Sequence, residues 1–337
     1  MRNVRPEALT GRPALGGLRV TVTGGAGFIG SRVVAALVRT GARVRVLDDL
    51  STGRFANLRA AMLSGLTRSE VSVCDIRTAA ATREIRSWAP AVVVHLAAQT
   101  SLPAARLSPQ ADVDINVGGT VNVLEACRQA GTETVVYAAS CAGYGLVPGH
   151  RLPVGEGEEC RPTGPYGLSK LTALRYVEMY RDCYGLGCSA LVLGNVYGPR
   201  AASPDAGVIA RMSDSVLRGV PPVIFGDGRQ TRDFVHVDDV VRAVLSACAR
   251  RPVGTVNVAS GVGSRIVDVL ETVNRAARRR IPAVHHPGRP GDVRDMVLDI
   301  GRAAEVLDWR PEIGLARGVG DLVRRASHDQ PLHLDAG

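Results

Sequence analysis

The 337-residue sequence is poor in lysine, in paired cysteines and in long apolar runs. Lys170 is the only lysine among 41 basic residues, so arginine occupies every other basic position. The seven cysteines form no CxxC pair, which argues against a disulfide framework and against structural zinc. The run AVVVHLAA is far too short to span a bilayer, and no other apolar run is longer. These absences predict a cytoplasmic protein with no membrane partner.

The N-terminal segment and the net charge exclude two further classes. Residues 1–17 contain no apolar segment of the kind that a signal peptide needs, and we expect them to form a flexible extension. The formal net charge is +9, but the arginines are spread along the chain. A nucleic-acid partner is therefore not expected, and arginines near a polyphosphate ligand are a better use of the charge.

Short β-branched runs alternate with helical patterns over the first part of the chain. The runs are almost continuously apolar, as in strands that helices cover on both faces. They predict an α/β fold with a Rossmann-type, doubly wound parallel sheet. Strands are expected at residues 18–24, 43–48, 71–74, 91–97, 134–140 and 189–194.

The pattern becomes rich in Gly and Pro after about residue 195. We therefore expect a dinucleotide-binding domain over residues 18–194 and a smaller, mainly substrate-binding domain over residues 195–330. One more strand is expected at 254–260. It predicts that a segment near 230–260 returns to the first domain.

A glycine-rich turn lies between the first expected strand and the first expected helix. The segment TGGAGFIG places Gly24, Gly27 and Gly30 there, where the backbone must turn tightly and approach a pyrophosphate at a helix N-terminus. Asp48 ends the second strand. A carboxylate there accepts hydrogen bonds from a ribose 2′-hydroxyl and repels a 2′-phosphate, so the pattern predicts NAD rather than NADP.

Eight segments, taken together and in order, carry a resemblance to a known family. The chain resembles an extended short-chain dehydrogenase/reductase of the nucleotide-sugar epimerase/dehydratase group, especially its UDP-glucose 4-epimerase-like members. The likeness runs from about residue 18 to about residue 325. The segments are TGGAGFIG, VLDDLSTGR, CDIR, VVHLAAQT, PYGLSK, GNVYGPR, QTRDFVHVDD and RPGDVR.

The resemblance implies positions for the cofactor. Asp75 and Ile76 are expected beside the adenine, and residues 96–99 are expected to line the cofactor cleft. The predicted cofactor-binding residues are Gly24, Gly27, Phe28, Ile29, Gly30, Asp48, Asp49, Asp75, Ile76, Leu96, Ala97, Ala98, Asn116, Tyr166 and Lys170.

Tyr166 and Lys170 are the predicted catalytic pair, with Ser140 as the third member. Four residues apart on a helix, Tyr166 and Lys170 share a face. A phenol titrates near 10, but an ammonium together with a cationic nicotinamide favours the phenolate. Lysine suits this role better than arginine, because its rotatable donors can also hold the nicotinamide ribose. Ser140 ends the fifth strand, where open α/β sheets place their ligands, and is expected to bond the reacting sugar oxygen.

The residues that follow Ser140 favour one reaction. In the resembling 4,6-dehydratases an Asp-Glu pair follows the hydroxyl residue, and related decarboxylases have a glutamate close by. Here Cys141, Ala142 and Gly143 follow, and elimination needs a second proton-transfer group that they lack. We therefore expect an isomerase, a UDP-glucose/UDP-galactose-type 4-epimerase that passes through a 4-ketosugar. A dehydratase or reductase of the same group, or a non-catalytic dinucleotide-sensing protein, remains an alternative.

The resemblance also implies how a nucleotide-sugar substrate is held. Asn195, Arg232 and Arg289 are expected to bind the diphosphate, and Asp292 to orient a neighbouring group or to contact the nucleotide ribose. Ser140 completes the predicted substrate-binding set. His236 and the pair His285–His286 have no accompanying carboxylate cluster, so no metal is expected.

The sequence leaves the sugar and the oligomeric state open. Mostly small candidate lining residues indicate a roomy pocket that could accept an N-acetyl group. Arg200 would suit a glucuronate, but Ala202 offers nothing to a carboxylate, which ranks glucose/galactose-type substrates first. A homodimer is expected through helices that include the one beginning at Tyr166, although its apolar residues could equally pack on their own sheet. The lining candidates are Ala142, Gly143, Ala201, Ala202 and Met296, and the helix residues are Leu171, Leu174, Val177 and Met179.

Overall fold

The computed structural model describes residues 15–199, 207–289 and 291–329. The extension expected over residues 1–17 therefore lies mostly outside the described residues. The strands are β1 (Arg19–Thr23), β2 (Arg43–Asp48), β3 (Val71–Val73), β4 (Val92–His95), β5 (Thr134–Ser140), β6 (Gly187–Leu193), β7 (Asn195–Tyr197), β8 (Val223–Phe225), β9 (Thr231–His236), β10 (Gly254–Val258), β11 (Gly263–Arg265) and β12 (Val284–His286). The helices are α1 (Phe28–Arg39), α2 (Arg59–Leu63), α3 (Ala79–Trp88), α4 (Leu102–Leu107), α5 (Pro109–Val113), α6 (Thr120–Ala130), α7 (Pro165–Tyr184), α8 (Val208–Arg218), α9 (Val237–Arg250), α10 (Ile266–Ala277), α11 (Gly301–Leu307) and α12 (Leu315–Asp329).

The central sheet is parallel throughout. Over the described ranges it has seven strands in the order β10-β6-β5-β4-β1-β2-β3, and every neighbouring pair is parallel. This confirms the predicted doubly wound fold. The strand order reverses between β1 and β4, and ligands of such sheets bind in the crevice beyond the carboxyl ends of the strands at that point.

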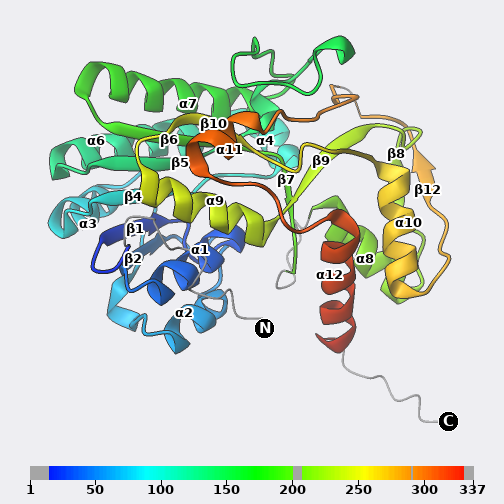
Figure 1. The fold of residues 1–337 in the computed structure, drawn as a ribbon, viewed down its shortest axis with the longest axis horizontal. Coiled ribbons are helices and arrows are strands. Elements are labelled where there is room, and N and C mark those ends of the chain that lie inside the picture. Colours follow the sequence, from blue (N-terminus) through cyan, green and yellow to red (C-terminus); the bar gives the residue numbers. More distant parts are fainter. Residues whose placement is uncertain (1–14, 200–206, 290, 330–337) are drawn as a thin grey trace.

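Helices cover both faces of this sheet, which explains why its strands are continuously apolar. Val92 and Val94 of β4 belong to the buried cluster under α1 and α9, whereas Val93 between them belongs to the cluster under α3, α6 and α7 (Figure 1). Alternate side chains of a strand point to opposite faces, so both faces need apolar residues. Burying each such valine contributes about 1.5 to 3 kcal/mol to stability.

Strand β10 joins the central sheet from far along the chain. Its residues 254–258 pair in register with Ser189–Leu193 of β6, and α9, which packs beside α1, leads the chain back to that edge. The structure thus places the strand expected at 254–260 in the main sheet.

The remaining elements form a smaller part beside the sheet. In the resolved portion of the chain, β11, β9 and β7 form one small sheet and β12 and β8 another, while α8, α10 and α12 pack around a separate apolar cluster at the right of Figure 1. Sequence analysis did not foresee these short strands. No helix among the described residues is long and apolar enough to cross a membrane.

One buried carboxylate joins the smaller part to the central sheet. Asp233 of β9 accepts hydrogen bonds from the backbone N–H groups of Ser260, Gly261 and Leu298 at 2.7, 3.0 and 3.2 Å. Burial raises the pKa of this carboxyl group, and these hydrogen bonds oppose the rise. Because Asp233 follows Arg232, the bonds fix the backbone of a predicted diphosphate contact relative to the end of β10.

Candidate active site

The glycine turn has no room for side chains. Gly24 has a φ of +67°, and a Cβ there would lie 2.6 Å from the backbone nitrogen of Ala97. A Cβ on Gly30 would lie 2.1 Å from the Gly24 carbonyl oxygen. Helix α1 begins at Phe28 without a side-chain cap, and the start of a helix directed at this turn favours an anionic pyrophosphate. The cradle therefore fits a dinucleotide.

Asp48 is fixed at the carboxyl end of β2 beside this turn. Its Oδ2 accepts a hydrogen bond from Ala26 N at 2.9 Å, and its Oδ1 accepts one from Leu50 N at 2.8 Å. Burial raises the pKa of its carboxyl group, and these two bonds oppose that rise. Each oxygen keeps a further lone pair for a ribose hydroxyl. Asp49 is exposed and instead bonds the backbone and hydroxyl of Ser51.

Of the two predicted adenine contacts, Asp75 pairs with a neighbouring arginine and Ile76 is buried. The Arg77 guanidinium forks onto the Asp75 carboxylate and lowers the pKa of that carboxyl group. Ile76 is buried, and its carbonyl oxygen accepts a hydrogen bond from Asn122 Nδ2 at 2.6 Å. Sequence analysis missed Arg77, although a basic residue two positions after Asp75 was a visible signal. Leu96, Ala97 and Ala98 follow β4 and are partly buried.

A chain of buried hydrogen bonds runs from the cofactor cleft to the turn before α6. Ala97 N donates to Thr23 Oγ1 at 3.3 Å, and Thr23 Oγ1 lies 2.7 Å from His95 Nδ1. His95 Nε2 lies 3.0 Å from Thr120 Oγ1, which donates to the Asn116 carbonyl oxygen at 2.6 Å. Because the Thr120 proton is used there, Nε2 must donate. Burial lowers the pKa of His95 to about 3, so the ring is neutral near pH 7 and its Nδ1 accepts from the Thr23 hydroxyl.

We expect His95→Phe to destabilise the protein by about 2 to 4 kcal/mol, because two buried hydroxyl groups lose a partner. Denaturant unfolding at pH 7.5 measures this. Below about pH 6.5 the histidine binds a proton in the unfolded chain but not in the folded protein. Its contribution to the free energy of unfolding therefore decreases as the pH falls. The difference in the free energy of unfolding between His95→Phe and the wild type should therefore become smaller from pH 7.5 to pH 5.

The matched control is His150→Phe, which changes an exposed histidine and should leave stability unchanged. A difference for His95→Phe that stays constant with pH would show that His95 acts as a space-filling residue and not through its neutral ring.

The side-chain amide of Asn116 is occupied by hydrogen bonds within the protein. It lies in the π-helical turn Asp114–Gly119 between α5 and α6 and is 1 % exposed. Its Nδ2 donates to Ser169 Oγ at 3.1 Å and to the Gln99 carbonyl oxygen at 3.1 Å, and its Oδ1 accepts from Gln99 N at 2.9 Å. Protein groups thus engage both ends of its amide, and it connects the LAAQ segment to α7.

Ser140, Tyr166 and Lys170 come together at the carboxyl end of β5. Pro165 begins α7, so Tyr166 stands in its first turn and Lys170 one turn later. Ser140 ends β5, and its hydroxyl hydrogen-bonds the Tyr166 phenol. Lys170 is 5 % exposed, and its Nζ lies 4.4 Å from the centroid of the Tyr137 ring, within cation–π range.

Burial dominates the electrostatics of Tyr166 and Lys170. Burial raises the pKa of Tyr166 to about 12. The hydrogen bond from Ser140 lowers this pKa by a smaller amount, and the charge of Lys170 does not lower it further. Burial lowers the pKa of Lys170 to about 7, opposed by Asp112. The chain alone therefore does not bring the phenol toward neutral pH. A base at Tyr166 depends on a further positive charge in the site.

The predicted diphosphate contacts gather around β9 and residues 289–292. Arg232 Nη2 donates to Asp292 Oδ1 at 2.6 Å, so two of the predicted substrate contacts pair with each other. The Arg289 guanidinium is exposed and lies 3.7 Å from the centroid of the Phe225 ring. Asp292 N also donates to the Arg289 carbonyl oxygen at 3.2 Å. Asn195 begins β7, paired in register with Phe234 of β9.

The structure describes only some of the candidate sugar-lining residues. Ala142 and Gly143 lie in the short turn after β5, and Gly143 is buried beside Leu171. Met296 is buried in the core cluster beneath α7, so its expected role in lining an open pocket is not supported. Arg200, Ala201 and Ala202 lie outside the described residues.

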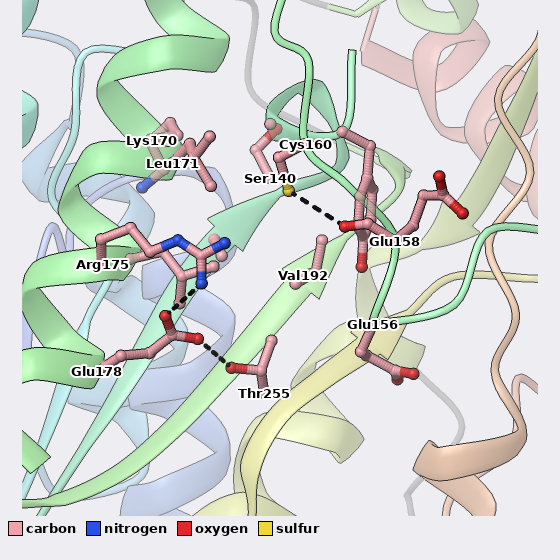
Figure 2. Close-up of a pocket in the computed structure, with 14 residues that line it drawn as sticks. Ser140, Glu156, Glu158, Cys160, Lys170, Leu171, Arg175, Glu178, Val192 and Thr255 are labelled. Carbon is pink, nitrogen blue, oxygen red and sulfur yellow. Dashed lines mark hydrogen bonds and ion pairs between the residues drawn. The ribbon is translucent and has the colours of Figure 1, made fainter. Parts of the chain in front are cut away.

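A pocket beneath α7 reaches two of the predicted catalytic residues. Figure 2 shows Ser140 and Lys170 at one end of it, with Arg175 and Glu178 on α7 and Thr255 on β10. Two of its charged residues pair with each other: Arg175 Nη1 lies 2.7 Å from Glu178 Oε2, and Thr255 Oγ1 donates to Glu178 Oε1 at 3.2 Å. Tyr166, the glycine turn and Arg232 do not line it. We therefore place the candidate active site on the other side of Ser140.

Metal chemistry finds no support in this site. No group of three His, Cys, Asp or Glu side chains in the described part of the chain could hold an ion. His236 is buried at the start of α9, where its Nδ1 accepts a hydrogen bond from Asp238 N at 3.2 Å.

Comparison with known proteins decides the family. The profile of the "NAD dependent epimerase/dehydratase family" matches residues 20–259. The chain belongs to this family. Membership confirms the resemblance seen in the sequence and confirms NAD as the cofactor. The glycine cradle and the fixed Asp48 carboxylate fit that cofactor.

Several family members that are similar over almost the whole chain are epimerases. A UDP-glucose 4-epimerase of Mycolicibacterium smegmatis is 40% identical over 309 residues, 91% of this chain and 97% of the relative. The crystal structure of a Thermotoga maritima UDP-glucose 4-epimerase with UDP-glucose has a TM-score of 0.86 and 34% identity, covering 92% of this chain and 99% of that one. A Thermus thermophilus UDP-glucose 4-epimerase in complex with NAD has a TM-score of 0.85 and 36% identity, covering 93% and 100%.

Proposed function

We propose that this chain is an NAD-dependent UDP-glucose 4-epimerase. The observation that carries the proposal is the grouping of Ser140, Tyr166 and Lys170 at the carboxyl end of β5, followed by a turn without a carboxylate. Such a site supports proton transfer at one sugar oxygen and lacks the second acid or base that elimination needs. The relatives named UDP-glucose 4-epimerase support the choice of substrate.

In this proposal residues 18–194 mainly hold the cofactor. Backbone N–H groups at Phe28 and Ile29 bind the pyrophosphate, and Asp48 accepts hydrogen bonds from the adenosine ribose. Lys170 donates to the nicotinamide ribose. When bound, NAD supplies the hydride acceptor and donor at C4 of the sugar and the positive charge that the phenol needs.

The chain's own residues handle the proton and the substrate. Tyr166 takes the proton of the sugar 4-hydroxyl and later returns it, while Ser140 donates a hydrogen bond to the same oxygen. Residues 195–330 mainly hold the substrate: Asn195, Arg232 and Arg289 bind the diphosphate, so that the 4-ketosugar can turn over while the nucleotide stays anchored. Asp292 holds the Arg232 guanidinium in place by their 2.6 Å contact.

An interconversion assay tests the proposed function. The protein, purified without added cofactor, is expected to carry NAD, because each catalytic cycle regenerates it, and to interconvert UDP-glucose and UDP-galactose. Parallel reactions with UDP-N-acetylglucosamine, UDP-glucuronate and dTDP-glucose define the sugar and the nucleotide. NAD-loaded protein that interconverts none of these sugars would contradict an epimerase, and release of a 4-keto-6-deoxy sugar would identify a dehydratase.

We also propose a homodimer through the outer face of α7. Leu174 and Val177 are buried in the chain's own core, so these two pack on the sheet. Leu168 in the first turn of α7 is 56% exposed, and Leu107 on the neighbouring α4 is 88% exposed. Such apolar side chains on adjoining helices are suited to a second copy. Light scattering on the purified protein should give twice the chain mass of 35.5 kDa.

A further inference from the structure

Asp112 is a buried carboxylate that the expected chemistry does not use. It lies on the short helix α5 and is 0% exposed. Gln99 Nε2 and Asn116 Nδ2 donate to its Oδ1 at 2.8 and 3.1 Å. Its Oδ2 is buried and has no hydrogen-bond partner among the described residues. A buried charge in this state is costly unless an opposite charge faces it.

Lys170 is the buried cation on the neighbouring helix. Helix α5 packs against α7, and the Asn116 amide that holds Asp112 Oδ1 also donates to Ser169, the residue before Lys170. Lys170 is itself buried, with its ammonium over the Tyr137 ring. The Asp112 charge opposes the lowering of the Lys170 pKa by burial.

The other titratable groups around Lys170 are neutral. His95 from β4 has a pKa of about 3, because of burial and the Lys170 charge. Burial raises the pKa of Tyr137 from β5 well above its usual value and that of Tyr166 from α7 to about 12. Among the groups named here, Asp112 is the one carboxylic acid.

We propose that Asp112 is a positioning residue whose carboxylate is the counter-charge that keeps the buried Lys170 protonated. A nicotinamide cation brought beside Lys170 disfavours a second positive charge, so an uncompensated lysine would lose its proton there. The Oδ2 atom, fixed through the bonds to Oδ1 and left without a hydrogen bond, provides the compensating charge. The consequence for turnover rests on the proposed function, whereas the charge state of Lys170 does not.

The single lysine allows a direct measurement. Protein grown with ¹³C-lysine gives one side-chain Cε signal, and its chemical shift against pH reports the ionisation of Lys170. In Asp112→Asn, which keeps the shape of the side chain, we expect the midpoint to fall by about 1 pH unit or more. The control Asp114→Asn removes an exposed carboxylate two residues away, which bonds Gln110, and should leave the midpoint unchanged.

Kinetics provide the second arm. Asp112→Asn is expected to lower kcat at pH 7.5 by about tenfold, with the KM for the UDP-sugar unchanged, and the deficit should shrink at pH 6, where the lysine regains its proton. A wild-type protein without epimerase activity would count against the proposed function, yet the lysine titration would still decide the role of Asp112.

A thermal double-mutant cycle covers the case in which Asp112→Asn folds poorly. Lys170→Met leaves the carboxylate without its counter-charge, so adding Asp112→Asn to Lys170→Met should raise Tm, although the same change lowers Tm in the wild type. A drop in Tm in both backgrounds, or a lysine midpoint that does not move in Asp112→Asn, would overturn the proposal.

Discussion

Tyr166→Phe is expected to lower kcat by about 10² to 10⁴-fold while NAD remains bound. In the proposed mechanism the phenol takes and returns the proton of the sugar 4-hydroxyl, and the neighbouring hydroxyl of Ser140 cannot replace it as a base. The phenyl ring keeps the packing of the first turn of α7, so the fold should be retained. Initial rates of UDP-sugar interconversion, with the NAD content measured after denaturation, check both parts.

The matched control for this variant lies on the same helix. Tyr176 is 38% exposed on α7, and Tyr176→Phe removes an equivalent hydroxyl far from Ser140. We expect its rate to equal that of the wild type. If Tyr166→Phe kept even a tenth of the wild-type rate with its NAD in place, proton transfer would have to run through another group.

Lys170→Arg should reduce kcat about 100-fold or more, although it preserves the positive charge. The ammonium lies over the face of the Tyr137 ring, 4.4 Å from its centroid, and Lys170 is only 5% exposed. A larger, planar guanidinium must shift its neighbours or leave its donors unpaired. Steady-state rates and NAD content should both fall, because the same side chain is proposed to hold the nicotinamide ribose.

Arg181→Lys is the converse control for Lys170→Arg. Arg181 lies on the outer face of α7 and pairs with Asp182, so exchanging it for lysine should not change the rate. Wild-type activity in Lys170→Arg would mean that the lone lysine is an accident of composition and that only its charge matters.

The central sheet could be predicted from the sequence because its signals are local. Continuous apolar runs such as VVV in β4 report burial on both faces, and Gly41, with a φ of +80°, follows α1 where a glycine commonly ends a helix. The short strands β7, β8, β9, β11 and β12 gave no such signal. Their apolar residues are few, and their pairing depends on contacts such as those of Asp233, which join segments far apart in the chain.

The residues of the candidate site also fall into those that could be predicted from the sequence and those that could not. Ser140, Tyr166 and Lys170 could be predicted because each stands at a defined place in a strand or helix. Asp112 and His95 were missed, since ADVDIN reads as an ordinary polar helix and His95 is hidden within an apolar strand. The four-residue spacing of Asp112 and Asn116, and an imidazole in a fully buried strand, were the available signals. The pKa of Tyr166 could not be predicted, because burial depends on tertiary packing.

The late position of β10 has a consequence for how the protein is made. Once residues 1–253 have left the ribosome, six of the seven strands of the central sheet have been synthesised. The outer edge of β6 has no neighbouring strand until residues 254–258 follow. During that interval β6 exposes unpaired backbone groups, the kind of edge on which other chains assemble. The nascent chain is therefore most exposed to aggregation while α9 is being synthesised, and completion of β10 closes that interval.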